Sequence, residues 1–475
     1  MFRRATPLLW IAGIAGALWL IFPFGFPNYD TVYPLVWGNE LAHGVSPDYG
    51  APQPPTPHPL ADLWGTIVSP LGAAGASDAT TVLAYLALGA IAYLVYRLGA
   101  LWFDAPIGVV AALIVLTRPP FLIDGLRAYV DLPYIALALA ALLIEVRRPR
   151  AGWPVLALLA VAGLLRPEAW LFSAVYLAYM ALERDTQKGR LALRRRPQLD
   201  ERALARLAAL AAVAPVAWAA FDLITTGDPL YSLTVTHDTV QTLGRQTGPV
   251  HLILDGPHQL GEVMQRPGLI GAAAGIALAL AFMRRRALIG IAATVLAAAA
   301  FVIVACAGLA IISRYMLLGS ALLCVFCAAA LLGWRLMPQT HPWRRRWQLI
   351  AAALALIFVV QAPQQYDYLS TVRSDIDSQS AIEADLHHLA ESGAFEQGCR
   401  PVSVPNHRAI PRLAAWLDLR PSAIVSVTEQ RRPSHGYFLE PANAEVAGHY
   451  FKAKVPPHFR LAARNASFLL YARCG

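Results

Sequence analysis

Long apolar runs dominate the chain and leave few folds open to it. Of its 475 residues, 57% are hydrophobic and only 15% are charged, whereas a soluble domain carries about 25% charged residues. Several runs approach the length of about 20 residues that an α-helix needs to cross a bilayer. The first run follows a basic flank and has no small-residue cleavage site, so we interpret it as a retained span. The sequence therefore predicts an all-α polytopic membrane protein.

The positions of the basic residues predict the orientation of these spans. Lys and Arg gather in short clusters between the apolar runs, as they do in the cytoplasmic loops of membrane proteins. Placing the N-terminus in the cytoplasm puts all of these clusters inside: Arg3/Arg4, Arg147/Arg148/Arg150, Arg184 to Arg206, Arg284/Arg285/Arg286 and Arg344/Arg345/Arg346. We expect a multi-pass protein of the cell inner (plasma) membrane with about eleven spans. They are 5–24, 79–97, 105–118, 131–146, 151–165, 168–183, 206–224, 267–283, 288–312, 315–335 and 347–362.

The net charge of +9 does not predict nucleic acid binding. The basic residues belong to the loop clusters, and no basic stripe with interleaved aromatic residues occurs. The expected partners are instead membrane lipids and the molecules that reach the outer surface.

The last part of the chain has a different composition from the rest. Short strand-like segments (RPVSVP, AIVSVT, GYFLEP and ASFLLYARC) alternate with helix-like segments (IEADLHHLAESGAF and RAIPRLAAWLDL). We therefore expect a transmembrane domain at 1–365 and a small extracytoplasmic α/β domain at 366–475. Cys399 and Cys474 bracket most of the latter, and an oxidising compartment would permit a disulfide between them.

Ionisable residues gather at the outward ends of the expected spans, and the first outer loop, 25–78, contains no Lys or Arg. Charges at membrane depth are costly, so they usually pair or line a cavity. These residues come from five separate junctions, and together they predict a charged cavity open to the outside. They are Asp30, Arg127 with Asp131, Arg166 with Glu168, Asp222 with Asp228, and Arg314.

Each of these residues also has a structural interpretation. An arginine at the end of a span often reaches the lipid headgroups, and Arg166-Pro167-Glu168 fits a turn with a local ion pair. Arg127 and Asp131 are four residues apart, so they would pair along one helix. Asp30 suits the N-cap of a helix through residues 31–44, and Gly227-Asp228-Pro229 has the composition of a turn.

The order of these segments resembles the GT-C superfamily of membrane glycosyltransferases, the group of the protein O-mannosyltransferases and the bacterial aminoarabinose transferases. The resemblance covers most of residues 1–335. It rests on an Asp after the first span in NYDTVYPLVWGNELAHGVSPDY, on the proline-rich PQPPTPHPL, and on LRAYVDLPYIAL, LLRPEAWLF, TTGDPLYS and SRYMLL.

The resemblance implies a mannosyltransferase-like enzyme of the cell envelope. Such an enzyme moves a sugar from a polyprenyl-phosphate carrier to an acceptor glycan, lipid or protein, usually with inversion. Asp30 would be the general base, and Arg314, with Arg127 or Arg166 as second choices, would bind the departing phosphate. Better-known members carry an Asp-Glu pair where this chain has Tyr29-Asp30. The remaining candidates for substrate binding are Asp131, Glu168, His58, Tyr29 and Asp228.

Metal dependence and two other functions stay open at this point. The sequence has no dense carboxylate cluster of the kind that binds divalent ions, so we expect a metal-independent reaction, with a divalent metal as the alternative. A transporter or flippase of lipid-linked sugars would share the charged cavity, but it should show internal repeats or paired interrupted helices, which we do not find. A non-catalytic membrane scaffold would not need Asp30.

Overall fold

The computed structural model describes residues 2–185, 192–195, 200–395, 398–430 and 433–474, so part of the Arg184 to Arg206 cluster lies outside the described residues. The chain divides into two compact units. The first, here the helical unit, comprises Met1–Ile21, Ala84–Gly125 and Val130–Val372. The second, here the loop–tail unit, comprises Phe22–Leu83, Leu126–Tyr129 and Arg373–Gly475. The first outer loop and the tail, which are far apart in sequence, therefore belong to one unit.

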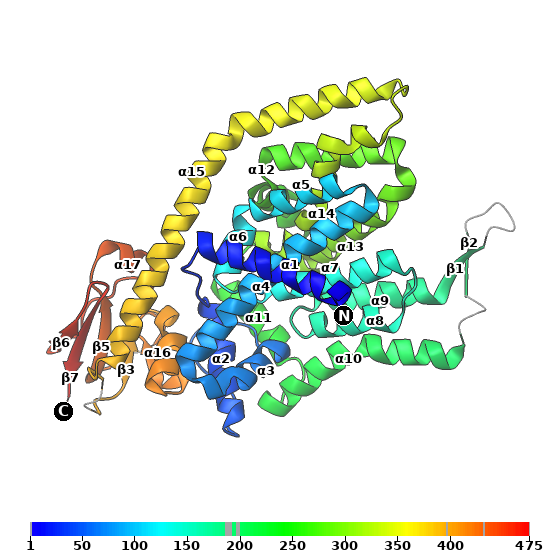
Figure 1. Ribbon diagram of the computed structural model, residues 1–475. Helices are drawn as coiled ribbons and strands as arrows, with labels where there is room; N and C mark the ends of the chain where they lie inside the picture. The colour runs from blue at the N-terminus through cyan, green and yellow to red at the C-terminus, as the bar shows by residue number, and fades with distance from the viewer. Residues whose placement is uncertain (1, 186–191, 196–199, 396–397, 431–432, 475) are drawn as a thin grey trace. The chain divides into compact units, whose positions relative to one another are not determined.

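The helical unit is built from α-helices (Figure 1). Helices α4 and α15 contribute residues to both units. A short hairpin, β1 (Leu182–Asp185) with β2 (Ala192–Arg195), follows α9. The helices are α1 (Phe2–Ile21), α4 (Gly72–Trp102), α5 (Ala105–Leu116), α6 (Pro119–Leu126), α7 (Asp131–Arg147), α8 (Trp153–Gly163), α9 (Glu168–Ala181), α10 (Glu201–Thr226), α11 (Tyr231–Thr242), α12 (Gly248–Phe282), α13 (Arg284–Cys306), α14 (Leu317–Leu332) and α15 (Trp343–Glu391), with 3₁₀ turns η2 (Ser313–Met316) and η3 (Gly333–Leu336).

Several of these helices have the length and apolarity of membrane spans. Among the described residues, six helices meet both criteria, and a seventh is added if α5 and α6, which are bent by 64°, form one broken span. Each of the expected spans overlaps one α-helix, although α8, with 11 residues, is shorter than a full crossing. The chain is therefore a multi-pass membrane protein, and the number of eleven spans stays a prediction.

Close approach of α12 and α14 organises the interior of the helical unit. A Cβ atom at Gly275 would lie 1.8 Å from the carbonyl oxygen of Phe326, so only glycine lets these two backbones meet. Helix α12 is interrupted at Gln265, whose φ is 56°. The buried Arg118 donates to the Met264 carbonyl at 3.0 Å and to Gln265 Oε1 at 2.8 Å, and thereby satisfies backbone that the break exposes.

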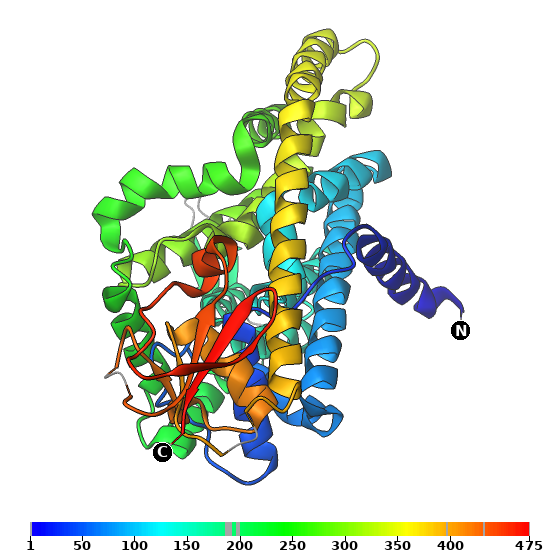
Figure 2. The ribbon, with the colours of Figure 1, turned by 90° about the vertical axis from the view of Figure 1, so that its left-hand side faces the viewer.

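The loop–tail unit combines two helices of the first outer loop with a five-stranded sheet of the tail (Figure 2). The sheet order is β4-β3-β5-β7-β6; β3 is parallel to β4 and β5, while β7 is antiparallel to β5 and β6. The elements are α2 (Tyr29–Ala42), α3 (Pro59–Val68), η1 (Ser69–Leu71), β3 (Val402–Val404), η4 (His407–Ala409), α16 (Ile410–Leu417), η5 (Pro421–Ala423), β4 (Ile424–Ser426), β5 (Gly436–Pro441), α17 (Ala444–Tyr450), β6 (Arg460–Arg464) and β7 (Phe468–Arg473).

The tail contains the expected segments and three features that the sequence did not predict. The four strand-like segments contain β3, β4, β5 and β7, and α16 lies in RAIPRLAAWLDL. Helix α17 and strand β6 were not expected. The third is that α15 continues from the last expected span through Pro363 into the tail, where we expected a separate helix. Cys399 and Cys474 form a disulfide with their Cα atoms 5.3 Å apart.

Two glycines bring α2 against α3 in the loop–tail unit. A Cβ at Gly65 would lie 2.1 Å from the Pro34 carbonyl oxygen, and one at Gly38 would lie 2.3 Å from the Thr66 nitrogen. The two helices consequently pack backbone to backbone. This contact fixes the direction of α2, whose first turn carries Asp30.

Candidate functional site

Asp30 lies in the first turn of α2, and Asn28 rather than Asp30 caps this helix. Asn28 Oδ1 accepts a hydrogen bond from the Asp30 backbone nitrogen at 2.7 Å. The alternative that Asp30 is the N-cap is therefore wrong, because the helix begins at Tyr29 and its cap is Asn28, two residues before Asp30. Asp30 is half-buried, and the partial positive charge of a helix N-terminus favours a carboxylate there.

A second segment of the chain docks on the residues before α2. Backbone hydrogen bonds join Phe26 N to Leu126 O and Asn28 N to Arg127 O, both at 2.9 Å. Asn28 Nδ2 also donates to Arg127 O at 2.7 Å. The segment that carries Arg127 thus lies against the residues that precede Asp30, within the loop–tail unit. Burial, together with the charges of Arg127 and Arg408, lowers the pKa of His449.

The tail also holds the backbone in front of Asp30, through a buried arginine. The Arg412 side chain is 6% exposed and donates to the Pro27 carbonyl oxygen. Its Nε lies 2.6 Å from Glu383 Oε2, and Tyr450 Oη donates to Glu383 Oε1 at 2.6 Å. No local signal in the sequence pointed to Arg412, since its partner is 385 residues away.

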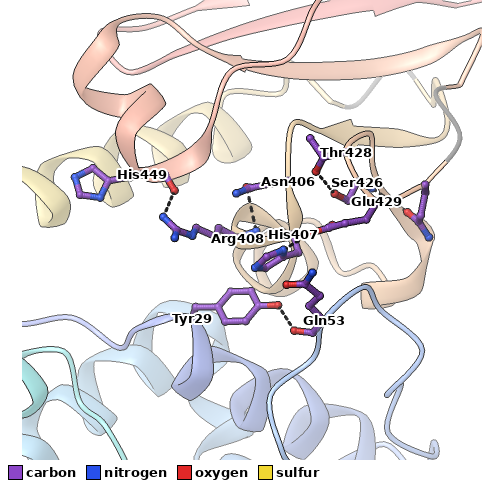
Figure 3. Close-up of polar contacts among 10 residues, drawn as sticks. Tyr29, Gln53, Asn406, His407, Arg408, Ser426, Thr428, Glu429 and His449 are labelled. Atoms are coloured by element: carbon purple, nitrogen blue, oxygen red, sulfur yellow. Dashed lines mark hydrogen bonds and ion pairs between the residues drawn. The ribbon is translucent and has the colours of Figure 1, made fainter. Parts of the chain in front are cut away.

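Tyr29 begins a cluster of polar and aromatic side chains (Figure 3). Its hydroxyl donates to the Gln53 carbonyl oxygen at 2.8 Å, and its ring meets His407 edge to face at 5.3 Å between centroids. His407 Nδ1 in turn lies 2.5 Å from Glu429 Oε1. Burial, and the nearby Tyr33, Asp30 and Glu429, raise the pKa of Tyr29. The sequence predicted a role for Tyr29 but missed His407 and Glu429.

In the helical unit, Arg166 is paired with two carboxylates. Its Nη1 lies 3.0 Å from Asp131 Oδ1, its Nη2 lies 2.5 Å from Glu168 Oε1, and its Nε donates to Glu168 Oε2 at 3.3 Å. All three side chains are buried, with exposed fractions of 8%, 3% and 7% for Arg166, Asp131 and Glu168. The guanidinium also lies 4.1 Å from the centre of the Tyr315 ring. We call these four residues the Arg166 cluster.

Arg314 borders the Arg166 cluster, since its guanidinium lies 5.6 Å from the centre of the same Tyr315 ring. Four of the candidates from the sequence, Asp131, Arg166, Glu168 and Arg314, thus lie around one tyrosine. The ion pair expected within Arg166-Pro167-Glu168 is present. The alternative pairing of Asp131 with Arg127 along one helix is wrong, because α6 ends at Leu126 and α7 begins at Asp131.

The remaining candidates do not join this cluster. Asp228 is exposed, and its Oδ1 accepts from Leu230 N at 2.9 Å after the left-handed Gly227 (φ 81°). These contacts match the turn that its composition suggested. Asp222 is buried and accepts from Ser232 N at 2.9 Å and from Ser232 Oγ at 2.8 Å. His58 is half-buried immediately before α3.

Candidate metal ligands are sparse. Within the part of the chain that the structure describes, no three His, Cys, Asp or Glu side chains are grouped so that they could hold a metal ion. The residues that could bind a phosphate or a sugar are therefore the arginines and the polar side chains described above.

Comparison with known proteins identifies the architecture. No family model and no curated protein matches the chain. Among solved structures, ArnT from Cupriavidus metallidurans in the apo state matches with a TM-score of 0.52 and 13% sequence identity, over 98% of this chain and 97% of that one. The chain has a GT-C fold.

Two archaeal structures show a weaker likeness to this GT-C fold. The Archaeoglobus fulgidus oligosaccharyltransferase in the apo form has a TM-score of 0.45 and 13% identity, over 82% of this chain and 59% of that chain. The oligosaccharyltransferase AglB from the same organism, in complex with an inhibitory peptide and a dolichol-phosphate, has a TM-score of 0.47 and 12% identity. That match covers 90% of this chain and 65% of the AglB chain.

Proposed function

We propose that the protein is an integral membrane glycosyltransferase that moves a sugar from a polyprenyl-phosphate carrier to an acceptor on the outer face of the membrane. The observation that carries this proposal is the GT-C fold, which the chain shares with ArnT over almost its whole length. The position of Asp30 in the first turn of α2 adds support, because it matches the acid that follows the first span in the family that the sequence resembles.

In this proposal Asp30 is the general base. The acceptor hydroxyl oxygen attacks the anomeric carbon of the donor sugar, and its proton passes to the Asp30 carboxylate. The bond between the anomeric carbon and the carrier phosphate oxygen breaks, and the phosphate leaves with the electron pair. A single displacement of this kind inverts the anomeric carbon.

The arginines supply the positive charge that the departing phosphate requires. Arg314 is our first choice for this role and Arg127 the second, because the charge of Arg166 is already balanced by Asp131 and Glu168. Asp131 Oδ2 is buried and has no hydrogen-bond partner among the described residues, so it is available to accept from a sugar hydroxyl. Glu168 positions Arg166, and His58, Tyr29 and Asp228 remain candidates for substrate contacts.

We also propose that the first outer loop and the tail face the outside of the inner membrane. The basic clusters between the spans support this orientation, and so does the disulfide between Cys399 and Cys474, because such bonds persist in oxidising compartments. A Val45→Cys variant places a thiol at a position that is 43% exposed in the loop. An impermeant maleimide should label it in intact cells. Labelling only after lysis would mean that the loop faces the cytoplasm and would contradict the proposed orientation.

The test of the activity is a transfer assay with a panel of radiolabelled polyprenyl-phosphate sugars. Membranes that contain the protein should consume one of these donors and release the carrier phosphate, while membranes with Asp30→Asn should not. Donor that crosses a vesicle membrane without being consumed would instead identify a flippase. A panel in which no donor is consumed or moved would favour a scaffold.

A further inference from the structure

Polar groups without partners gather near Tyr29 in the loop–tail unit. Gln53 Oε1 and Asn406 Nδ2 are both buried and have no hydrogen-bond partner among the described residues. Asn406 is only 4% exposed. Buried polar atoms are nearly always paired in folded proteins, so two such atoms in one neighbourhood indicate a ligand or ordered water.

The neighbouring histidine has one ring nitrogen engaged and one available. His407 Nδ1 lies 2.5 Å from Glu429 Oε1. Burial raises the pKa of Glu429, but hydrogen bonds from His407 and Ser426 lower it by more, so the carboxylate is ionised near neutral pH. Nδ1 is thus engaged by Glu429, and Nε2 is the ring nitrogen left for a ligand.

These groups come from two parts of the chain that meet at the Tyr29 ring. Figure 3 shows the Gln53 side chain pointing toward His407, with the Tyr29 hydroxyl beneath them. Gln53 has a φ of 50°, a left-handed conformation that is uncommon for a residue with a side chain and often marks a functional position. The side chains of His407 and Glu429 are 18% and 21% exposed, so a ligand can reach them.

The mixture of donors and acceptors restricts the chemistry of a ligand. A phosphate or carboxylate has acceptors only, so it cannot satisfy Gln53 Oε1, and Glu429 repels it. A bare cation leaves Asn406 Nδ2 without a partner. A hydroxyl group both donates and accepts, and the ring of Tyr29 offers an apolar surface for the carbon face of a sugar.

We infer that Tyr29, Gln53, Asn406 and His407 form a saccharide-binding subsite, and that the acceptor is consequently a hydroxyl-bearing glycan. That the bound sugar is the acceptor rests on the proposed function, whereas the subsite itself does not. Glu429 holds the His407 ring. Tyr29 directly precedes Asp30 in the chain, so the subsite contains the sequence neighbour of the residue that we propose as the base.

The inference is tested by saccharide binding to the full-length protein without any donor. The protein is purified in an amine-oxide detergent, because sugar-based detergents would compete. Maltose, lactose, mannobiose and diacetylchitobiose are the probes, and saturation-transfer NMR measures their dissociation constants. His407→Phe keeps the ring against Tyr29 but removes both nitrogens, and Gln53→Gly suits the left-handed backbone. The matched control is His435→Phe, an exposed histidine of the same sheet domain.

We expect at least one probe to bind the unmodified protein, and each of the two variants to weaken that binding about tenfold or more, the effect of losing one hydrogen bond to a buried group. His435→Phe should leave binding unchanged. Absence of binding by every probe, or equal binding by His407→Phe and Gln53→Gly, would overturn the subsite. Saccharide binding without sugar transfer would keep the subsite and reject the enzyme. Transfer to a peptide or lipid without saccharide binding would keep the enzyme and reject the subsite.

Discussion

The Arg166 cluster and the group around Tyr29 are both polar, but they differ in how completely their atoms are paired. Arg166 is bonded to Asp131 and Glu168 and stacked on Tyr315, and all three charged side chains are at most 8% exposed. Around Tyr29, Gln53 Oε1 and Asn406 Nδ2 have no partner among the described residues. One atom of the Arg166 cluster, Asp131 Oδ2, also has no partner within the described ranges, but every charged side chain of that cluster is held by an ion pair. Ion-paired buried charges hold a structure together, whereas the unpaired neutral groups around Tyr29 have capacity for a ligand.

Charge gives a second difference between these two regions. Two carboxylates surround the Arg166 guanidinium, so Arg166 is paired within its own cluster. The Arg314 guanidinium lies 5.6 Å from the centre of the same Tyr315 ring. In the proposed function the two arginines therefore have separate roles: we propose that Arg166 stabilises the fold and that Arg314 binds the donor phosphate.

The largest effect on stability is expected from Arg166→Met. It leaves two buried carboxylates without their counter-ion, so it should destabilise the protein by about 3–5 kcal/mol, measured as a fall in the apparent Tm in detergent. The triple variant Arg166→Met/Asp131→Asn/Glu168→Gln removes all three charges and should recover most of that loss. A stable Arg166→Met protein with impaired donor binding would give Arg166 the role that we assign to Arg314.

The next effect is expected from Arg314→Ala. Removing a positioned cation from the departing phosphate should lower the transfer rate about a hundredfold and leave the apparent Tm nearly unchanged. Arg335→Ala is the matched control, because Arg335 is an exposed arginine at the other end of α14. Unchanged donor kinetics in Arg314→Ala would show that Arg314 is structural.

The smallest expected effect is on the pH dependence of stability, through Glu429 beside His407 and Tyr29. The pKa of Glu429 lies below its ordinary value of 4.5, because hydrogen bonds from His407 and Ser426 outweigh burial. A carboxyl group with a lowered pKa stabilises the fold above its ordinary pKa and loses this contribution as pH falls through the lower, folded-state value. Glu429→Gln should therefore flatten the fall of the apparent Tm below about pH 4.5.

The expected size of this pH effect is under about 1 kcal/mol, because the pair is partly exposed. Glu391→Gln is the control, since it removes a similar pair with His387 whose carboxyl side chain is 63% exposed. Equal plots of apparent Tm against pH for the unmodified protein and Glu429→Gln would mean that the contact of Glu429 with His407 makes no net contribution to stability.

The helices were predictable because their signal is local. Each apolar run that predicted a span overlaps one α-helix, although several runs extend past its ends, and the short strands β3, β4, β5 and β7 lie in the segments that indicated them. Strand β6 was missed because RLAAR is charged and mostly exposed, so it lacks the alternation of a half-buried strand. The continuous α15 was missed because Pro363 is usually read as a helix end.

The candidate site was predictable only where its contacts join residues that are close in sequence, or where its residues are unusual in a membrane span. Arg166 and Glu168 are two residues apart, and buried charges at span ends are conspicuous. Arg412 and His407 carried no such signal: one meets Pro27 and the other Tyr29, contacts that close only when the tail folds onto the first outer loop. Arg118 likewise meets a helix break 147 residues away.

The central claim is that Asp30 removes the proton from the acceptor, and the direct measurement compares Asp30→Asn with the unmodified protein in donor binding and in transfer. Asparagine keeps the size of the side chain but is not a base. We expect donor affinity within about twofold of the unmodified protein and a transfer rate lower by about a hundredfold or more, the contribution of a positioned general base. Asp78→Asn, at an exposed aspartate of α4 that is not among the site candidates, should transfer normally. Transfer by Asp30→Asn at the unmodified rate would contradict the account.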